Sequence, residues 1–228
     1  KAYLKLYEEA IKDFDEAIKL DNNFPLAYNN RALAKYNLQQ YQEAIKDYDK
    51  AIELDNNYSL AYNNRGIAKS DLKLYEEAIK DYDKAIELDN NYSSAYNNRG
   101  NTKYNLHQYE EAIKDYDKAI ELDNNYSSAY YNRGIAKSDL KQYDEAIKDY
   151  NKAIELDNNY SSAYYNRGIA KADLHQYEEA IKDYDKCIEL DNNNSLAYNN
   201  RGNAKADLLQ YEEAIKDFDE AIELDNNF

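Results

Sequence analysis

Residues 59–92 read SLAYNNRGIAKSDLKLYEEAIKDYDKAIELDNNY, and this 34-residue string recurs in register along the chain. Residues 1–24 match its last 24 positions, so the sequence predicts a partial repeat, made of the end of a first helix and a second helix, before the full ones. A strict period without insertions indicates stacked units, none of which buries its apolar face alone. We therefore expect one continuous solenoid domain. Its full repeats occupy residues 25–58, 59–92, 93–126, 127–160, 161–194 and 195–228.

Each repeat contains two helical patterns, which we call the first and the second helix. In the second helix, Tyr75, Ala78 and Ile79 begin an apolar face that returns every three or four residues. In the first helix, Gly66 recurs as Gly in later repeats, which indicates that a neighbouring side chain occupies the space of the missing Cβ. A tight turn is expected around Lys73, between the two helices.

The run from Asp89 to Asn91 is expected to end the second helix. Asn tolerates the left-handed conformation that often follows a helix, and its side chain can also cap the helix that comes next. The chain begins at repeat position 11 and stops at position 34 without a polar capping helix, so we expect a fragment of a longer array, with ends that can stack on another copy.

Composition excludes several classes of function. The formal charge is −16 and no basic block occurs, which argues against nucleic acid and anionic membranes as partners. One Cys and two His leave little for a metal site or a catalytic triad, and the carboxylates recur identically in every repeat, so no pair is distinguished. We predict no catalytic residue, metal or cofactor, and therefore no enzyme. No apolar run approaches the roughly 20 residues of a membrane span, and a cytoplasmic location is expected.

The repeat resembles the tetratricopeptide repeat (TPR) family across the whole chain. That family has aromatic residues at positions 4, 17 and 24 and small residues at 8, 20 and 27. In residues 59–92 these are Tyr62, Gly66, Tyr75, Ala78, Tyr82 and Ala85. The resemblance implies an all-α TPR solenoid, a right-handed superhelix of antiparallel helix pairs whose first helices line the concave side. Two departures are Asn in place of Pro at position 32 and Arg in place of Leu at position 7.

All the arginines of the chain stand at position 7, in a protein whose other basic residues are Lys. This restriction predicts a role that Lys cannot fill, such as a bidentate contact with a carboxylate. We interpret the series as structural ion pairs, with Asp81 and its equivalents or the acids at position 31, such as Asp89, as partners. A site for a ligand carboxylate is the alternative. The series comprises Arg31, Arg65, Arg99, Arg133, Arg167 and Arg201.

Position 6 is Asn in every full repeat, and the resemblance places positions 2, 5, 6, 9, 12 and 13 on the groove. A row of amides can grip the backbone of an extended peptide, as in the similar ladder of O-GlcNAc transferase, because an amide both donates and accepts. Alternatively, Asn merely fills a solvated surface. The series comprises Asn30, Asn64, Asn98, Asn132, Asn166 and Asn200.

The remaining groove positions suggest which peptides would fit. Position 5 carries Asn63, Asn97, Tyr131 and Tyr165, and position 9 carries Ile67, Asn101, Ile135 and Ile169. Position 13 is Asp in four repeats, so we expect a partner with apolar and basic side chains. The family's clamp for acidic C-terminal tails is not expected, because position 6 is not basic. Cys187 is interpreted as a packing residue, and His107 and His175 as surface residues.

The leading hypothesis is a non-catalytic protein-protein interaction scaffold that binds an extended peptide segment in the concave groove. The alternatives are a substrate-docking arm of a larger enzyme and a structural array that self-associates end to end.

Overall fold

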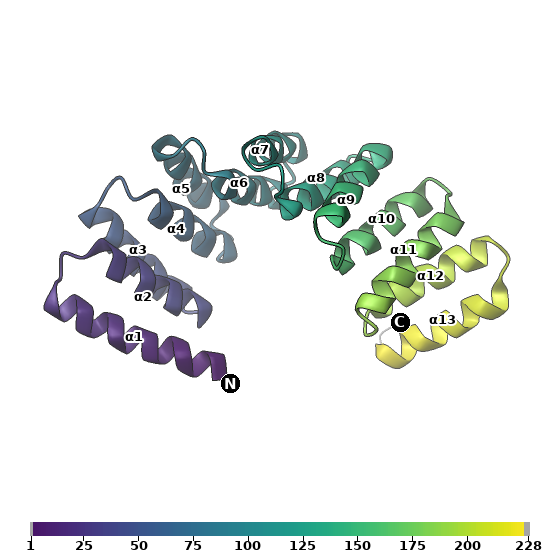
Figure 1. Ribbon diagram of the computed structural model, residues 1–228, viewed down its shortest axis with the longest axis horizontal. Helices are drawn as coiled ribbons and strands as arrows, with labels where there is room; N and C mark the ends of the chain where they lie inside the picture. Colours follow the sequence, from purple (N-terminus) through teal and green to yellow (C-terminus); the bar gives the residue numbers. More distant parts are fainter. Residues whose placement is uncertain (1, 226–228) are drawn as a thin grey trace. The chain divides into compact units, whose positions relative to one another are not determined.

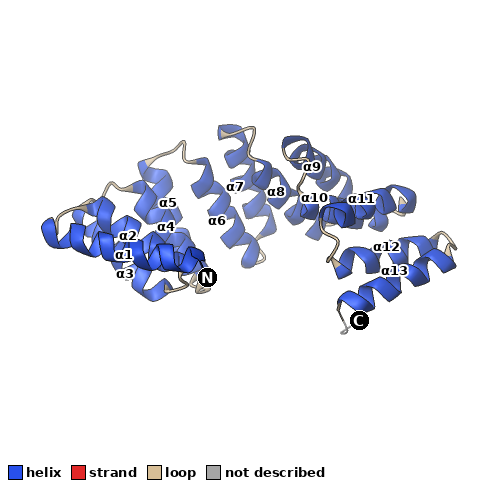
Figure 2. Cartoon of the chain, turned by 60° about the horizontal axis from the view of Figure 1, so that its bottom comes forward, coloured by secondary structure: helices blue, strands red, loops and turns tan. Residues whose placement is uncertain are grey.

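The computed structural model describes residues 2–225 and divides the chain into two parts, Lys1–Leu122 and Asp123–Phe228 (Figure 1). Within the described range every regular element is a helix (Figure 2), so the prediction of an all-α repeat fold is confirmed. The N-terminal part contains α1 (Ala2–Leu20), α2 (Pro25–Asn37), α3 (Tyr41–Leu54), α4 (Ser59–Asp71), α5 (Tyr75–Leu88), α6 (Ser93–Asn105) and α7 (Tyr109–Leu122). The C-terminal part contains α8 (Ser127–Asp139), α9 (Tyr143–Leu156), α10 (Ser161–Asp173), α11 (Tyr177–Leu190), α12 (Ser195–Asp207) and α13 (Tyr211–Leu224).

Inside each part the helices stack as antiparallel pairs. Each first helix packs on the second helix of its own repeat and on that of the preceding repeat, as α4 does on α5 and α3. First helices of neighbouring repeats also touch, whereas within residues 2–225 no two second helices of neighbouring repeats do. The first helices are therefore the more closely spaced layer, and each part curves toward them (Figure 1).

The turn between the two helices of a repeat closes with a left-handed residue at position 15. In the second full repeat this is Lys73, with φ of 61°. The N–H of Leu74 donates to the carbonyl of Lys69, and the N–H of Lys73 donates to that of Ser70, both at 2.9 Å. These are the two hydrogen bonds of a Schellman motif. Gln, Lys, His or Leu occupies the left-handed position, so the motif forms here without Gly or Asn.

The prediction that Asn residues end the second helix in the left-handed conformation is wrong. The helix ends at Asp89, whose backbone is extended with φ of −140°, and the Asn residues that follow have negative φ. The Asp89 carboxylate accepts a hydrogen bond from the N–H of Asn91 at 3.0 Å, which satisfies the turn without a positive φ. Tyr58, not Asn, is the N-cap residue of α4, and no side chain caps that helix.

The first 24 residues also differ from the expectation. The sequence predicts the end of a first helix, a turn and a second helix, but α1 is one unbroken helix from Ala2 to Leu20. Leu4 to Leu6 are helical there, although the same Leu-Lys-Leu triplet forms the turn at residues 72–74. The turn at Lys73 is held by α4 packing on α5, a contact that has no counterpart along α1.

Small residues and tyrosine rings make the core between helices. Ala78 and Ala85 of α5 are completely buried, and the ring of Tyr82 is 1% exposed. A Cβ on Gly66 would lie 2.7 Å from Cε1 of Tyr82, so the absent methyl group leaves room for this ring. The predicted reason for the recurring Gly is thus found in the packing of α4 on α5.

Candidate functional site

The arginine at position 7 forms a bidentate pair with an aspartate of its own repeat. Nε of Arg65 donates to Oδ2 of Asp81 at 2.9 Å, and Nη2 donates to Oδ1 at 2.5 Å. The Lys69 ammonium lies 2.7 Å from the same carboxylate, and Asp81 is only 4% exposed. The guanidinium also lies 5.4 Å from the ring centre of Tyr62, within the range of a cation–π contact.

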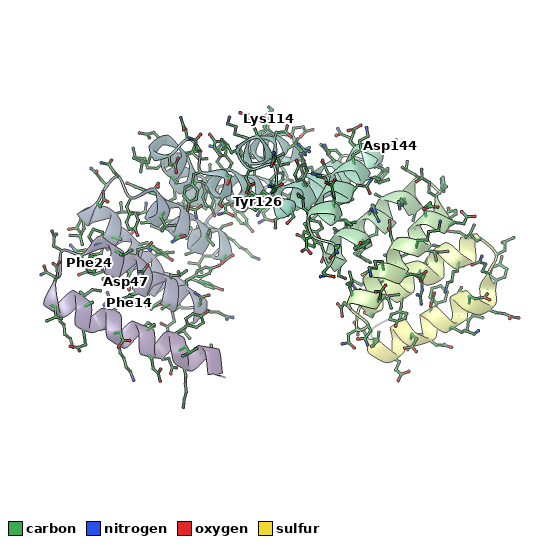
Figure 3. All side chains as sticks on the ribbon, in the orientation of Figure 1. Phe14, Phe24, Asp47, Lys114, Tyr126 and Asp144 are labelled. Atoms are coloured by element: carbon green, nitrogen blue, oxygen red, sulfur yellow. The ribbon has the colours of Figure 1, made fainter. Side chains whose placement is uncertain are left out.

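The remaining guanidinium nitrogen links neighbouring repeats. Nη1 of Arg65 donates to Oδ1 of Asp49, on the second helix of the preceding repeat, at 2.7 Å. Figure 3 labels Asp47, the equivalent of Asp81 in the first full repeat, which lies inside the stack, whereas Lys114 on α7 points outward. The same bidentate pair joins Arg31 to Asp47, Arg99 to Asp115, Arg133 to Asp149, Arg167 to Asp183 and Arg201 to Asp217.

These contacts separate the two sets of acids considered from the sequence. Asp81 and its equivalents meet the arginines, whereas Asp55 and Asp89 at position 31 accept backbone hydrogen bonds in the turns between repeats. Burial acts to lower the pKa of Arg65, but the hydrogen bonds and charges of Asp81 and Asp49 outweigh it and raise that pKa. With Asp81 holding both Arg65 and Lys69, these cations are engaged within the protein instead of facing a ligand carboxylate.

The amides at positions 5 and 6 form a ladder between repeats of the N-terminal part. Nδ2 of Asn64 donates to Oδ1 of Asn29 at 3.3 Å, and Nδ2 of Asn98 donates to Oδ1 of Asn63 at 3.1 Å. Asn63 and Asn97, at position 5, are each 4% exposed, whereas Asn30, Asn64 and Asn98 are half-buried. Position 5 therefore supplies the buried acceptors of the ladder, and position 6 supplies the amides that lie nearer the surface.

Tyrosines replace the buried amides in the C-terminal part. Nδ2 of Asn166 donates to the hydroxyl of Tyr131 at 2.8 Å, and Nδ2 of Asn200 donates to that of Tyr165 at 3.0 Å. The ring of Tyr131 also packs at 4.7 Å from that of Tyr160. Burial raises the pKa of both Tyr131 and Tyr165. These two rings are half-buried parts of the ladder rather than open shelves, and Asn132 beside them is also half-buried.

Position 9 lies next to the ladder on the same helices. Ile67, Ile135 and Ile169 are half-buried there. Asn101, in the same position, accepts a hydrogen bond from the hydroxyl of Tyr116 at 2.8 Å. Asn203, its counterpart in the last repeat, is exposed.

Two pockets with equivalent linings lie on the first helices of different parts, apart from an apolar one between α1 and α2. The pocket between α4, α5 and α6 has a volume of about 250 Å³, with Ile67, Asp71 and Asn101 among its walls. The pocket between α10, α11 and α12 has a volume of about 200 Å³, with Ile169 and Asn203 in the equivalent places. Each reaches the tyrosine at position 24, which the sequence marks only as an aromatic position of the family. In the sequence, both pockets are marked by Asn at position 9 of the second of the two repeats that line them, where the other full repeats have Ile or Leu.

The less common residues fit their expected places. Cys187 is free and buried, and burial raises the pKa of its thiol. Nδ1 of His107 lies 2.8 Å from the hydroxyl of Tyr109 in an exposed turn, and His175 pairs with Tyr177 in the same way. Among residues 2–225 no cluster of three metal-ligating side chains is found. Over the same residues, no helix combines the length and apolar character needed to cross a bilayer.

Comparison with known families and structures agrees with this architecture. The family described as "tetratricopeptide repeat" matches residues 25–58, 59–92, 93–126, 127–160, 161–194 and 195–228, and one described as "TPR repeat" matches residues 3–39. The search of curated proteins gave no match.

Three solved structures illustrate the likeness. MamA is 28% identical with a TM-score of 0.67, over 71% of this chain and 94% of that one. YrrB, described as a TPR protein with an unusual peptide-binding site, is 27% identical with a TM-score of 0.64, over 81% and 95%. PilF of Pseudomonas aeruginosa is 20% identical with a TM-score of 0.80, over 95% of both chains, and supports the fold alone.

Proposed function

Because the chain belongs to the tetratricopeptide repeat family, and is thereby a protein-interaction scaffold, we propose that its first helices bind an extended peptide segment of a partner protein. The observation that carries the proposal is the amide ladder. Asn64 donates one amide N–H to Asn29 and accepts one hydrogen bond from Asn63, which leaves its second N–H and the second lone pair of its oxygen for a ligand. These two groups match the acceptor and the donor of a peptide backbone.

The ladder also fixes the orientation of the amides before a peptide arrives. Asn64 donates to Asn29 and accepts from Asn63, so both ends of its side chain are held. Fewer side-chain rotamers are then lost on binding, which favours affinity. In each part, the amides at position 6 repeat once per helix pair, so they can meet an extended segment at regular intervals.

The neighbouring positions favour apolar and basic side chains in the bound segment. Ile67 and Ile169 border the ladder, and Asp71 and Asp173 lie one helical turn further along. The chain carries a formal charge of −16, which repels an acidic segment and attracts a basic one. YrrB, which is described as having a peptide-binding site, supports peptide binding as the function of this chain.

The test begins with selection of binding peptides from a random dodecapeptide library on the full chain, followed by affinity measurement by fluorescence anisotropy. Replacing Asn64, Asn98 and Asn166 with Ala removes the surface amides, and binding should weaken at least tenfold. The matched control replaces Asn56, Asn90 and Asn158, which are exposed amides in the turns between repeats, with Ala and should keep the affinity. Equal losses in both variants would show that the ladder amides make no specific contact with the peptide, and an absence of selected peptides would exclude the function.

Self-association is a second candidate, favoured by the exposed side of α13. Tyr211 and Ile215 are each 58% exposed, whereas Tyr177 and Ile181, their equivalents on α11, pack against the core. A second copy could cover this side. Light scattering over a hundredfold range of concentration should then show a rising mass that Ile215→Lys abolishes, and a constant monomer mass would reject it.

A further inference from the structure

The pocket between α10, α11 and α12 combines aliphatic side chains with two carboxylates. Its volume is about 200 Å³, and one wall is apolar, with Ile169, Ala172 and Ala204. The opposite lining is polar and includes Asp173 and Asp207. All the first-helix residues named here face the same side as the amide ladder, so the pocket opens beside the proposed peptide path.

The phenol at the base of this pocket has no hydrogen-bond partner among the residues that the structure describes. Tyr184 is 1% exposed and lines the pocket. Two of the equivalent hydroxyls are engaged: Tyr116 donates to Asn101 at 2.8 Å, and Tyr150 lies 3.2 Å from the hydroxyl of Ser138, whereas the hydroxyl of Tyr48 also has no partner among the described residues. In the repeat of Tyr184, Ile169 stands at the position of Asn101 and Ala172 at that of Ser138. Among the described residues no unpaired side-chain oxygen is fully buried, so this hydroxyl opens into the pocket, where a ligand or water can bond to it.

The two carboxylates of the pocket are not balanced by a cation. Asp173 and Asp207 occupy position 13 of successive repeats, and both are exposed. The nearest lysines along their helices are already paired, Lys171 with Asp183 at 2.8 Å and Lys205 with Asp217 at 2.7 Å. The pocket therefore presents negative charge above a free phenol oxygen and beside an aliphatic wall.

This combination selects a long cationic side chain. A lysine ammonium has three donors, and the pocket offers acceptors on Asp173, Asp207 and Tyr184. The methylene stem of a lysine can lie along Ile169 and Ala172 while its charged end meets the carboxylates. An acidic side chain would be repelled, and a neutral apolar one would leave the phenol unsatisfied.

We propose that this pocket is a lysine-binding subsite, which anchors one lysine of the peptide held by the amide ladder. The proposal rests on the proposed function and adds the identity of one peptide residue. The pocket between α4, α5 and α6 is its weaker counterpart, because its position-13 residues are Asp71 and Asn105, and Asp71 already accepts a hydrogen bond from the hydroxyl of Tyr36.

The experiment uses peptides selected on the full chain from a random dodecapeptide library, each remade with norleucine or Nε-acetyl-lysine in place of single lysines. On the native chain, one lysine of the peptide should contribute more to affinity than the others, and its replacement should weaken binding at least tenfold. On the Asp173→Asn/Asp207→Asn variant, the same replacement should matter less than twofold. Asn occurs naturally at position 13, as Asn37 and Asn105, so the variant should fold.

Two further variants isolate the pocket from general charge. Glu178→Gln/Glu212→Gln removes the same charge from exposed sites of second helices and should keep the tenfold preference. Tyr184→Phe should reduce the preference about threefold and keep the ring, as Phe218 does at the same position. A preference for lysine that survives the double aspartate replacement overturns the subsite while leaving peptide binding intact. If no peptide is selected, the proposed function fails, and the subsite fails with it.

Discussion

Arg167 donates a hydrogen bond from Nη1 to Oδ1 of Asn151 at 2.6 Å, in the place where Arg65 meets Asp49 at 2.7 Å. The link between repeats therefore keeps its geometry when its acceptor is neutral. The bidentate pair of the same arginine with Asp183 is unchanged, at 2.9 and 2.5 Å. Orientation of the guanidinium thus comes from the buried aspartate of its own repeat, and the acid of the preceding repeat adds charge to a contact already formed.

Asn151→Asp should stabilise the protein slightly. The substitution restores the charge found at Asp49 and Asp185, whose side chains are 55% and 54% exposed in their pairs with arginine. Exposed pairs of this kind contribute about 0.5 kcal/mol and are screened by salt. Urea unfolding at low ionic strength should show the gain, and 1 M NaCl should remove it. A gain that persists in high salt would contradict a purely electrostatic effect.

Arg65→Lys should destabilise the protein by about 2 kcal/mol, because Asp81 is buried and would lose a bidentate partner that one ammonium cannot replace. The change is read from the midpoint of urea unfolding. Lys84→Ala is the control, since Lys84 pairs with Glu87 on the exposed side of the same repeat and should change stability by less than about 0.5 kcal/mol. Similar losses in the two variants would show that the buried pair has no special role.

The sequence was sufficient to predict the two helices of each full repeat and the reason for Gly66, because periodicity and small-residue spacing report local geometry and packing directly, but it did not predict the unbroken α1. It did not predict which residue is left-handed. Asn91 has the higher intrinsic preference, but the Asp89 carboxylate satisfies that turn, and packing of α4 on α5 imposes the positive φ on Lys73 instead. Tertiary contacts overrode local propensity at this turn.

The candidate site was predictable only in part. Position 6 could be placed by analogy, but the burial of Asn63 and its hydrogen bond with Asn98 depend on the distance between repeats, which no spacing in the sequence provides. The pocket at Tyr184 was missed for the same reason. The Tyr184 hydroxyl lacks a partner because Ile169 and Ala172, which cannot form a hydrogen bond through their side chains, both lie beside the ring. The sequence does not show that these three residues meet.

Gly66→Ala should destabilise the protein by about 1 kcal/mol. The added methyl group would lie 2.7 Å from Cε1 of Tyr82, and overpacking of this kind costs about 1–3 kcal/mol. The better helix propensity of Ala returns up to about 1 kcal/mol. Ala32 packs in a cluster with Tyr48 in the first full repeat, which shows that the ring can adjust and keeps the expected loss small. In a Tyr82→Leu background the loss should disappear, and an unchanged loss there would exclude the ring as its cause.

Replacing single tyrosine hydroxyls should give opposite results in two repeats. Tyr116→Phe removes the hydrogen bond to Oδ1 of Asn101 and should cost about 1 kcal/mol. Tyr184→Phe removes a hydroxyl that has no partner in the described part of the chain, so its effect on unfolding should be near zero or slightly stabilising. Both rings are 1% exposed, and both changes remove the same atom, so burial and volume are matched. Thermal and urea unfolding measure the difference. If the two variants lose the same stability, Tyr184 has a partner after all and the free acceptor required for the lysine subsite does not exist.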